Sequence, residues 1–452
     1  MTLVHERYNS GKAALQKEIR GQRRSIVLML SKFFRRLSLL HAIAIASIMG
    51  AALASAQTQP PAQAWPGLKV SGQNIVDANG NNFVLKGLGL GEWTNTEAYM
   101  LQWPDRKGKY LWYYGYTRIH NTLDTLLGEQ AARQYWQAWQ ANAVTESDVA
   151  RWQSWGVNAI RISINYHWLS PSDGVYLDSG WQWIDQMIAW CKAHHIYVIL
   201  CMHAAPGAQS PELMSDTADG QPHLWTQPEV YQPWTIHLWQ AIARRYANEP
   251  AVGGYDLLDE PILNERHPVE GGAKVRDFYV RTTQAIRSVD THHIIFACGT
   301  SWCGSPAGVR AMLPTWDDNM VLVFHKYWDP NTQKDIQGYL DLRKQYNVPL
   351  WNGETGENTN KWAKDMADLM AANNVGWSWW TYKKINKTTE ACSIPQPPGY
   401  DQILRYVSGK GPRPSREDAD RIMLQLAGNA ATSNCKWNNE LIEALFGVPA
   451  LK

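Results

Sequence analysis

The chain has 452 residues and a formal net charge of +2 at pH 7, with 43 basic and 41 acidic side chains. This length can bury one large core or two modest ones, and the balanced charge gives no reason to expect a nucleic acid or a strongly acidic partner. Aromatic usage is unusual, with 24 Trp and 20 Tyr against only 7 Phe. Trp and Tyr combine a flat apolar face with a hydrogen-bonding edge, which suits a stacked sugar, although many of them will fill the core.

Residues 1–56 are predicted to be an N-terminal extension and signal peptide. Arg35 and Arg36 precede the apolar stretch Leu37–Leu53, and Ala54-Ser55-Ala56 resembles a cleavage site of small residues. A membrane anchor is the alternative, because the stretch approaches the ~20 residues that a span requires. The small residues at its end favour cleavage, so we expect a secreted or periplasmic protein that is free of the membrane after cleavage.

Met29 opens a signal of ordinary proportions, so residues 1–28 are interpreted as lying ahead of the true initiator. Residues 57–64 follow the cleavage site as a short tether of Pro, Gln, Thr and Ala. Residues 65–452 are predicted to form a single catalytic domain, because they contain no Ser/Thr/Pro-rich linker that would mark off a binding module.

The domain opens with a predicted hairpin of residues 68–70 and 74–77, with its turn at Asn79-Gly80, which would cap the bottom of the fold. Eight apolar, strand-like runs follow at residues 83–87, 159–164, 197–202, 252–258, 293–297, 320–324, 349–351 and 375–381. Helical spacing separates most of them, over residues 181–194, 233–248, 274–288, 338–346 and 361–373, and a capped helix is expected to begin at Thr145. Hairpins could not join strands across such intervals, so we predict parallel strands in an α/β fold, a (β/α)₈ TIM barrel.

Two segments depart from this simple repeat. A long insertion after the first strand carries a dense aromatic run from Trp93 to Tyr116, and it is expected to lie on the catalytic face of the barrel. Residues 384–452 are interpreted as the final helix with an elaborated loop, not as a second domain.

The six cysteines divide into two groups. Cys191 and Cys201 lie in apolar helix and strand contexts and are expected to be buried thiols. The plausible bridges join Cys298 to Cys303 and Cys392 to Cys435, although sequence alone cannot fix the pairing. No spacing of Cys or His matches a zinc site, so no metal is predicted.

Two glutamates, Glu260 and Glu354, each follow a short apolar run. The carboxyl ends of barrel strands converge on one open face, and two carboxylates there can cleave a glycosidic bond, one as proton donor and the other as nucleophile or base. Arg161 lies inside another apolar run and must be paired, because an unpaired buried charge is prohibitive. Further polar or aromatic residues are expected at the same ends of other strands, namely His203, Asp259, His325, Tyr327 and Trp380.

In this combination the chain resembles glycoside hydrolase family 5, the retaining β-glycanases, over roughly residues 65 to 405. The resemblance implies that Glu260, in Asp-Glu-Pro, is the acid/base and that Glu354, in Glu-Thr-Gly, is the nucleophile. It also implies substrate-binding or supporting roles for Arg161, His203, Asp259, His325, Tyr327 and Trp380. The segment from His203 to Gln209, His-Ala-Ala-Pro-Gly-Ala-Gln, is similar to the motif of the exo-β-glucanase and β-glucosidase branches.

The implied reaction is double displacement at a β-linked oligo- or polysaccharide, without a cofactor, by a monomer. Asp259 departs from the family pattern, which has Asn before the acid/base. An ionised Asp can only accept a hydrogen bond, and its charge would raise the pKa of Glu260. β-Glucans or β-glucosides are the favoured substrates, ahead of endo-β-1,4-glucanase activity and of mannan. The rival functions are a catalytically silent carbohydrate-binding barrel and a metal-dependent hydrolase using His203, His325 and an Asp.

Overall fold

The structure is a computed structural model that describes residues 67–103, 115–262 and 268–449. The predicted signal peptide and tether lie outside these ranges, as do Trp112, Tyr113 and Tyr114 of the aromatic insertion. Within the described part of the chain, no helix is both long and apolar enough to cross a membrane.

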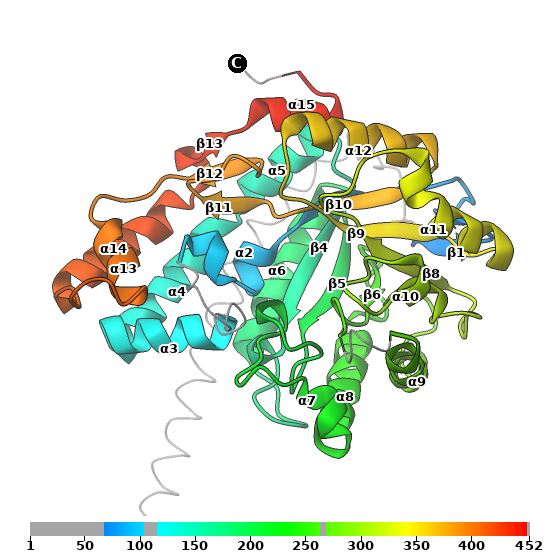
Figure 1. Ribbon diagram of the computed structural model, residues 1–452, viewed down its shortest axis with the longest axis horizontal. Coiled ribbons are helices and arrows are strands. Elements are labelled where there is room, and N and C mark those ends of the chain that lie inside the picture. The colour runs from blue at the N-terminus through cyan, green and yellow to red at the C-terminus, as the bar shows by residue number, and fades with distance from the viewer. Residues whose placement is uncertain (1–66, 104–114, 263–267, 450–452) are drawn as a thin grey trace, which may run out of the picture. The chain divides into compact units, whose positions relative to one another are not determined.

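Eight parallel strands close into a barrel, with helices arranged around the outside (Figure 1). The strands are β3 (Lys86–Gly89), β4 (Ala159–Asn165), β5 (Tyr197–Ala204), β6 (Val252–Asp256), β7 (Ile294–Cys298), β8 (Met320–His325), β9 (Leu350–Gly356) and β10 (Gly376–Trp380), and β10 pairs with β3 to complete the ring. The barrel helices include α5 (Glu146–Trp155), α6 (Asp178–Ala193), α8 (Pro228–Tyr246), α9 (Pro268–Arg287), α11 (Gln333–Tyr346) and α12 (Asn360–Ala372). The predicted fold class is thus confirmed.

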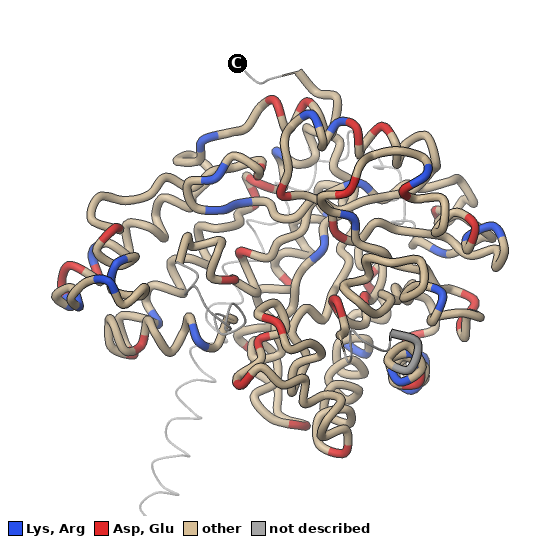
Figure 2. The backbone as a smooth tube through the Cα atoms, in the orientation of Figure 1, with Lys and Arg blue, Asp and Glu red and all other residues tan. Residues whose placement is uncertain are grey.

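Local signals explain where elements begin. Thr145 and Asp148 form a reciprocal capping box at the start of α5, as the sequence predicted, and left-handed Gly156 ends that helix. The prediction for β9 was too short, since the strand continues beyond Trp351 to Gly356 and contains Glu354. Its polar residues disguise it, because Asn352, Glu354 and Thr355 are buried in the strand although their side chains are polar. Figure 2 shows acidic and basic residues interspersed along the outer helices, in keeping with the balanced composition.

The N-terminal hairpin exists, but its predicted turn is wrong. β1 (Lys69–Ser71) and β2 (Asn74–Val76) pair across a turn that contains Gly72, which has the left-handed φ of 57°. Asn79-Gly80 forms a separate turn after β2, where the Asp77 carboxylate accepts the backbone N–H groups of Asn79 and Asn81. That turn leads to a single bridge between Val76 and Asn82.

The inside of the barrel has two layers of different chemistry. The lower layer is apolar, and Leu68 and Ile75 of the hairpin pack into it from below; its buried members also include Leu85, Ala159, Ile199, Ile294, Phe296, Val321, Val323 and Trp351. Side chains of a strand alternate between its faces, so the next inward positions lie two residues further along. These carry Arg161, Cys201, Asp256 and His325, which form the upper layer. On β9 a bulge at Gly353 shifts the register, so that Glu354 lies opposite His325.

The C-terminal segment contains strands that were not predicted. β11 (Lys383–Ile385), β12 (Cys392–Ile394) and β13 (Lys436–Trp437) form a three-stranded sheet. The connecting helices are α13 (Tyr400–Val407), α14 (Arg416–Asn429) and α15 (Asn439–Phe446), of which α14 contacts α4 (Glu129–Ala143) and α15 contacts α12. These strands escaped prediction because they are only two or three residues long.

Both proposed disulfides are present, and Cys191 and Cys201 are buried free thiols.

Candidate active site

The two glutamates lie together at the carboxyl end of the barrel. Both line a cavity of about 570 Å³, which is also lined by His203, His325 and Trp380. The Nδ1 atom of His325 lies 2.7 Å from Glu260 Oε1 and 3.7 Å from Glu354 Oε2. Because one imidazole nitrogen contacts both carboxyl groups, their arrangement is compatible with the separation of ~5–5.5 Å that a retaining pair requires.

Glu260 is held as a buried acid. It follows β6 with a left-handed φ of 38°, a conformation that a non-glycine residue adopts only when its surroundings enforce it. Burial, Asp259 and Glu354 raise the pKa of Glu260 well above its usual range. Burial lowers the pKa of its neighbour His325 to about 3, so the imidazole is neutral near pH 7. A protonated Glu260 is the form that can donate a proton to a leaving group.

Arg161 connects three carboxylates across the barrel. Its side chain is fully buried, and it donates to Asp256 at 2.8 Å, to Asp259 at 2.7 Å and to Glu354. The expectation that a buried arginine must be paired is confirmed. One positive charge facing three carboxylates leaves a surplus of negative charge, and burial raises the pKa of Asp256 to about 6.

Arg161 by itself does not bring the pKa of the nucleophile down to its usual range. Burial and the Asp259 carboxylate raise the pKa of Glu354 well above its usual range, although Arg161 and the Tyr327 hydroxyl, which donates to Glu354 Oε2 at 2.8 Å, act to lower it. Burial also acts to raise the pKa of Asp259, but the charges of His203 and Arg161 outweigh it and hold that pKa low. Glu354 therefore competes with Asp259 for a single cation.

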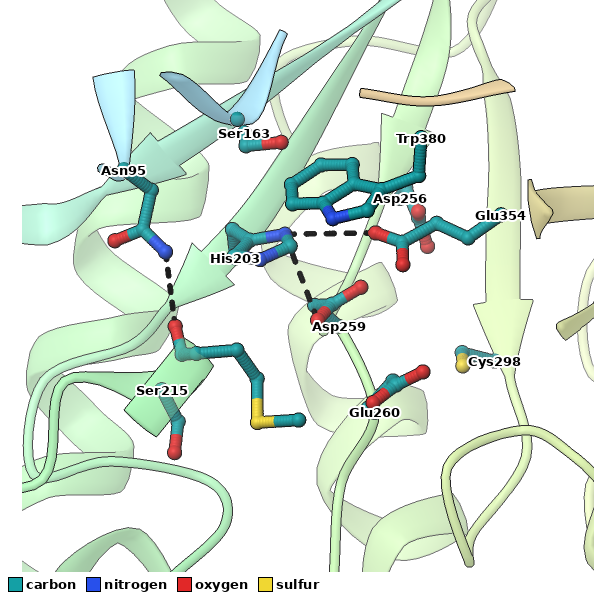
Figure 3. Close-up of polar contacts among 12 residues, drawn as sticks. Asn95, Ser163, His203, Ser215, Asp256, Asp259, Glu260, Cys298, Glu354 and Trp380 are labelled. Carbon is teal, nitrogen blue, oxygen red and sulfur yellow. Dashed lines mark hydrogen bonds and ion pairs between the residues drawn. The ribbon is translucent and has the colours of Figure 1, made fainter. Parts of the chain in front are cut away.

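A stacked pair of rings forms one wall of the cavity. The rings of Trp380 and His203 are stacked, with centroids 4.9 Å apart and planes 11° from parallel. Figure 3 shows the two side chains next to each other. Trp380 Nε1 donates to the Tyr99 hydroxyl at 2.8 Å, and His203 Nε2 lies 3.4 Å from Glu97 Oε1. Burial raises the pKa of Glu97 to about 7, against the opposing influence of His203.

Three residues that contribute to this site were not among the predicted site residues. Glu97 and Tyr99 come from the insertion after the first strand, where only the density of aromatics drew attention. Gln209 was noticed as part of a motif, but its function becomes visible only in the structure. Its side-chain amide donates to the backbone oxygens of His203, at 2.7 Å, and of Asp259, at 2.9 Å. It thereby fixes the ends of β5 and β6 relative to each other.

The mouth of the cavity is aromatic. Trp302 is 36% exposed and Trp328 is 71% exposed, the highest values among the tryptophans that the structure describes, and both line the cavity. Leu213 and Met214 also lie there, and the Asn95 amide holds that segment by donating to the Met214 backbone oxygen at 3.0 Å. Large exposed apolar groups gathered at a cavity are typical of a binding surface.

The site contains a group of side chains that could in principle bind a metal ion, as the metal-hydrolase alternative requires. Ligand atoms of Asp259, His325 and Glu354 lie within 4.8 Å of one another. Each of these side chains already has a partner, since Arg161 binds Asp259 and Glu354, and His325 contacts Glu260. The nearby Arg161 charge also opposes a cation at this position, so the arrangement fits proton transfer better than metal binding.

Comparison with known proteins agrees with this geometry. The model of the cellulase family (glycosyl hydrolase family 5) matches residues 123–386, more than half of the chain. Similar curated proteins include a β-xylosidase of Phanerodontia chrysosporium, 26% identical over 355 residues that cover 70% of this chain and 71% of that protein. Endoglucanase C of Acetivibrio thermocellus is 21% identical, covering 54% of this chain and 85% of its own. A probable glucan 1,3-β-glucosidase A of Emericella nidulans is 30% identical over an alignment that covers 50% of this chain and 55% of that protein.

Proposed function

The chain belongs to glycosyl hydrolase family 5, and from that premise we propose that Glu354 and Glu260 perform the retaining double displacement of this glycosidase. Glu354 attacks the anomeric carbon while Glu260 gives its proton to the departing oxygen. In the second step Glu260 removes a proton from water, which releases the sugar from Glu354. The single observation that carries this proposal is the contact of both carboxyl groups with His325 Nδ1 inside one cavity.

The remaining residues support the two glutamates. Arg161 and Tyr327 stabilise the ionised form of Glu354 that must attack. The raised pKa of Glu260 favours the protonated form, which is the form that donates to the departing oxygen. Trp380, stacked on His203, provides an apolar face beneath the sugar whose bond is cleaved.

Chemical rescue tests the role of Glu260. Glu260→Ala should hydrolyse unactivated β-glycosides about 10²–10⁴-fold more slowly, because general acid catalysis is lost. A dinitrophenyl glycoside needs no proton for departure, so added azide should restore product release and yield a β-glycosyl azide, which NMR identifies. Ordinary activity of Glu260→Ala on unactivated substrates would refute the assignment.

The two rival functions predict different results for the intact protein. A catalytically silent binding barrel would bind saccharide without any turnover, and a metal-dependent hydrolase would lose its activity in the presence of a chelator.

The substrate we propose is a β-glucan or β-glucoside cleaved at a chain end. The motif from His203 to Gln209, and the position of Glu97, Tyr99 and Trp380 in the lining of the cavity, support a pocket in place of an open groove. The similar proteins include both a β-xylosidase and an endoglucanase, so endo-β-1,4-glucanase activity is the second candidate and mannan the third.

A product profile distinguishes these candidates. Cellulose, laminarin, mannan and aryl β-glucosides should be compared, with viscosity measured on a neutral soluble glucan. Charged derivatives such as carboxymethylcellulose are less suitable, because Glu97, Glu212, Asp329 and Glu357 also line the cavity. An exo-acting enzyme releases one small product and barely lowers the viscosity. A rapid fall in viscosity with a ladder of oligosaccharides would contradict the proposed pocket.

We further propose that the protein is exported and acts as a monomer. The apolar stretch Leu37–Leu53 with its cleavage site supports export, and so do the two disulfides, which persist in oxidising compartments. N-terminal sequencing of the mature protein from its source should begin near Gln57. Recovery with residues 1–56 intact in the membrane fraction would favour the anchor. Light scattering of the purified protein tests the monomer.

A further inference from the structure

The loop that follows β7 has an unusual construction. Cys298 is the last residue of β7, and a disulfide joins it to Cys303, only five residues later, with both side chains fully buried. Ser301, Trp302 and Cys303 all have left-handed φ values between 52° and 57°. Three consecutive non-glycine residues in this region are costly, so the loop needs a covalent or packed restraint to keep this shape. The disulfide supplies one.

This loop contacts the residue that holds the acid. The ladder between β7 and β8 ends with Cys298 opposite Val323. Two residues further along β8, the backbone N–H of His325 donates to the backbone oxygen of Cys303 at 3.1 Å. The same His325 presents its Nδ1 to Glu260 at 2.7 Å. A single residue, His325, therefore connects the disulfide loop to Glu260, the proton donor.

The loop also forms part of the cavity mouth. Trp302 projects from it into the cavity lining, next to Ser301 and Gly304. Glu260 protonates the departing oxygen, so the leaving group must lie on the side of Glu260 and His325. Figure 3 shows Cys298 beyond Glu260, on the side of the site away from His203 and Trp380. The loop thus borders the leaving-group half of the site.

We propose that the Cys298–Cys303 loop is a positioning device for the leaving-group half, which fixes Glu260 through His325 and holds Trp302 at the mouth. This proposal rests on the assignment of Glu260 as the acid/base. The cysteines touch no reacting atom, so their effect on the reaction passes through His325 and Trp302 alone.

Positioning of the acid has a kinetic signature that general stability lacks. A leaving group of low pKa, such as 2,4-dinitrophenolate, departs without a proton, whereas an alkoxide departs only when protonated. A displaced Glu260 therefore slows substrates with poor leaving groups and spares activated ones. Damage to the fold slows both equally.

The chain offers a matched control. The second disulfide, Cys392–Cys435, joins β12 to the residue before β13, outside the cavity lining. Cys298→Ala/Cys303→Ala and Cys392→Ala/Cys435→Ala remove the same chemical group from the two regions. Alanine is preferred to serine because a buried hydroxyl without a partner would be destabilising.

The experiment measures kcat/KM of the full-length protein for a series of β-glycosides whose leaving groups range from dinitrophenol to alcohols. This constant reports the steps up to the glycosyl-enzyme, in which Glu260 acts as the acid. For Cys298→Ala/Cys303→Ala we expect about 10–100-fold loss with alcohol leaving groups and less than about 3-fold loss with dinitrophenol. Cys392→Ala/Cys435→Ala should show the same small loss across the whole series. Trp302→Ala keeps the disulfide and removes only the ring at the mouth, so it should not reproduce the selective loss with alcohol leaving groups. The same selective loss in Trp302→Ala would mean that the loop acts through Trp302 and not by positioning Glu260, and would overturn the proposal.

Equal losses across the series, or none, would overturn the proposal. If the double variant does not fold, the same series is measured on wild-type protein treated with a phosphine, with mass spectrometry establishing which bridge has opened. Activity on dinitrophenyl glycoside shows in each case that the nucleophile is intact. Absence of turnover by the untreated wild type would instead refute the proposed function.

Discussion

The lower and upper layers of the barrel interior are built on the same strands, yet they differ in almost every physical property. Phe296 and Trp351 of the lower layer form an edge-to-face pair with centroids 5.1 Å apart, within a cluster of buried apolar side chains. Two residues above Phe296 on β7 is Cys298, and the upper layer around it holds Arg161 with three carboxylates. Along each strand, the apolar lower layer and the charged upper layer are therefore separated by only two residues, which is one repeat of the inward-facing side chains.

This contrast shows how the barrel separates stability from reactivity. The lower layer buries apolar surface and excludes water. The upper layer inherits that dry environment, which is why burial shifts the pKa values of Glu260, Glu354 and Asp256 upward. If the comparison is correct, substitutions in the upper layer should alter activity and pH dependence, whereas those in the lower layer should alter stability alone.

The sharpest test of the upper layer is Glu354→Gln. The amide cannot form the covalent intermediate, so turnover should fall by at least about 10⁴-fold, as when other enzymes lose their nucleophile. Because the two side chains have nearly the same shape, the melting temperature should stay close to that of the wild type. Glu249→Gln, at a partly exposed position after α8 that does not line the cavity, is the control and should remain fully active. Measurable turnover by Glu354→Gln would assign the nucleophile elsewhere.

Arg161→Leu should affect both properties. Removing the cation leaves buried carboxylates without a partner, which typically destabilises a protein by about 3–5 kcal/mol, and kcat/KM should fall at least about 10²-fold because Glu354 loses its charge partner. The pKa values of Asp256 and Glu354 already lie above their unfolded values and should rise further. Stability from such groups is present at low pH and lost as pH rises, so urea titrations should show a larger deficit at pH 8 than at pH 5. A deficit that does not depend on pH would contradict this explanation.

Phe296→Ala is the matching test of the lower layer. The cavity left by a fully buried phenylalanine should lower the free energy of unfolding by about 3–5 kcal/mol. At a temperature where the variant remains folded, kcat/KM should change by less than about twofold, because the side chain does not line the substrate cavity. Chemical denaturation and steady-state kinetics on the same sample measure both. A large kinetic defect in folded protein would show that the layers are not independent.

Asp259→Asn should produce the smallest and most specific effect. The Asp259 charge raises the pKa of both Glu260 and Glu354, so its removal should lower both. The acidic limb of the kcat/KM profile reports the ionised nucleophile and the alkaline limb the protonated acid, so the whole profile should move to lower pH. An unchanged alkaline limb would mean that Asp259 does not influence the acid.

The sequence predicted the barrel because each strand is a distinct apolar run, and it predicted Arg161, His203, Glu260, His325 and Glu354 because they interrupt or end those runs. The bulge at Gly353 was not predictable, since it is set by the pairing of β9 with β8 and not by local preference. The amide bridge of Gln209 also escaped, because its two acceptors are backbone atoms of distant residues. The short strands of the C-terminal sheet are likewise defined by partners far apart in the chain.

The position of the N-terminal hairpin determines which end of the barrel a tag, a carrier or a surface would be attached to. Leu68 and Ile75 enter the barrel from the end opposite the catalytic cavity, and Val70 N–H is anchored to the Asn319 side chain at 2.7 Å, at the entrance of β8. A tag, carrier or surface joined directly to Leu68 would therefore be linked at the end of the barrel opposite the cavity. Immobilisation through that point should orient the open cavity towards the solution, so that even a bulky polysaccharide can reach it.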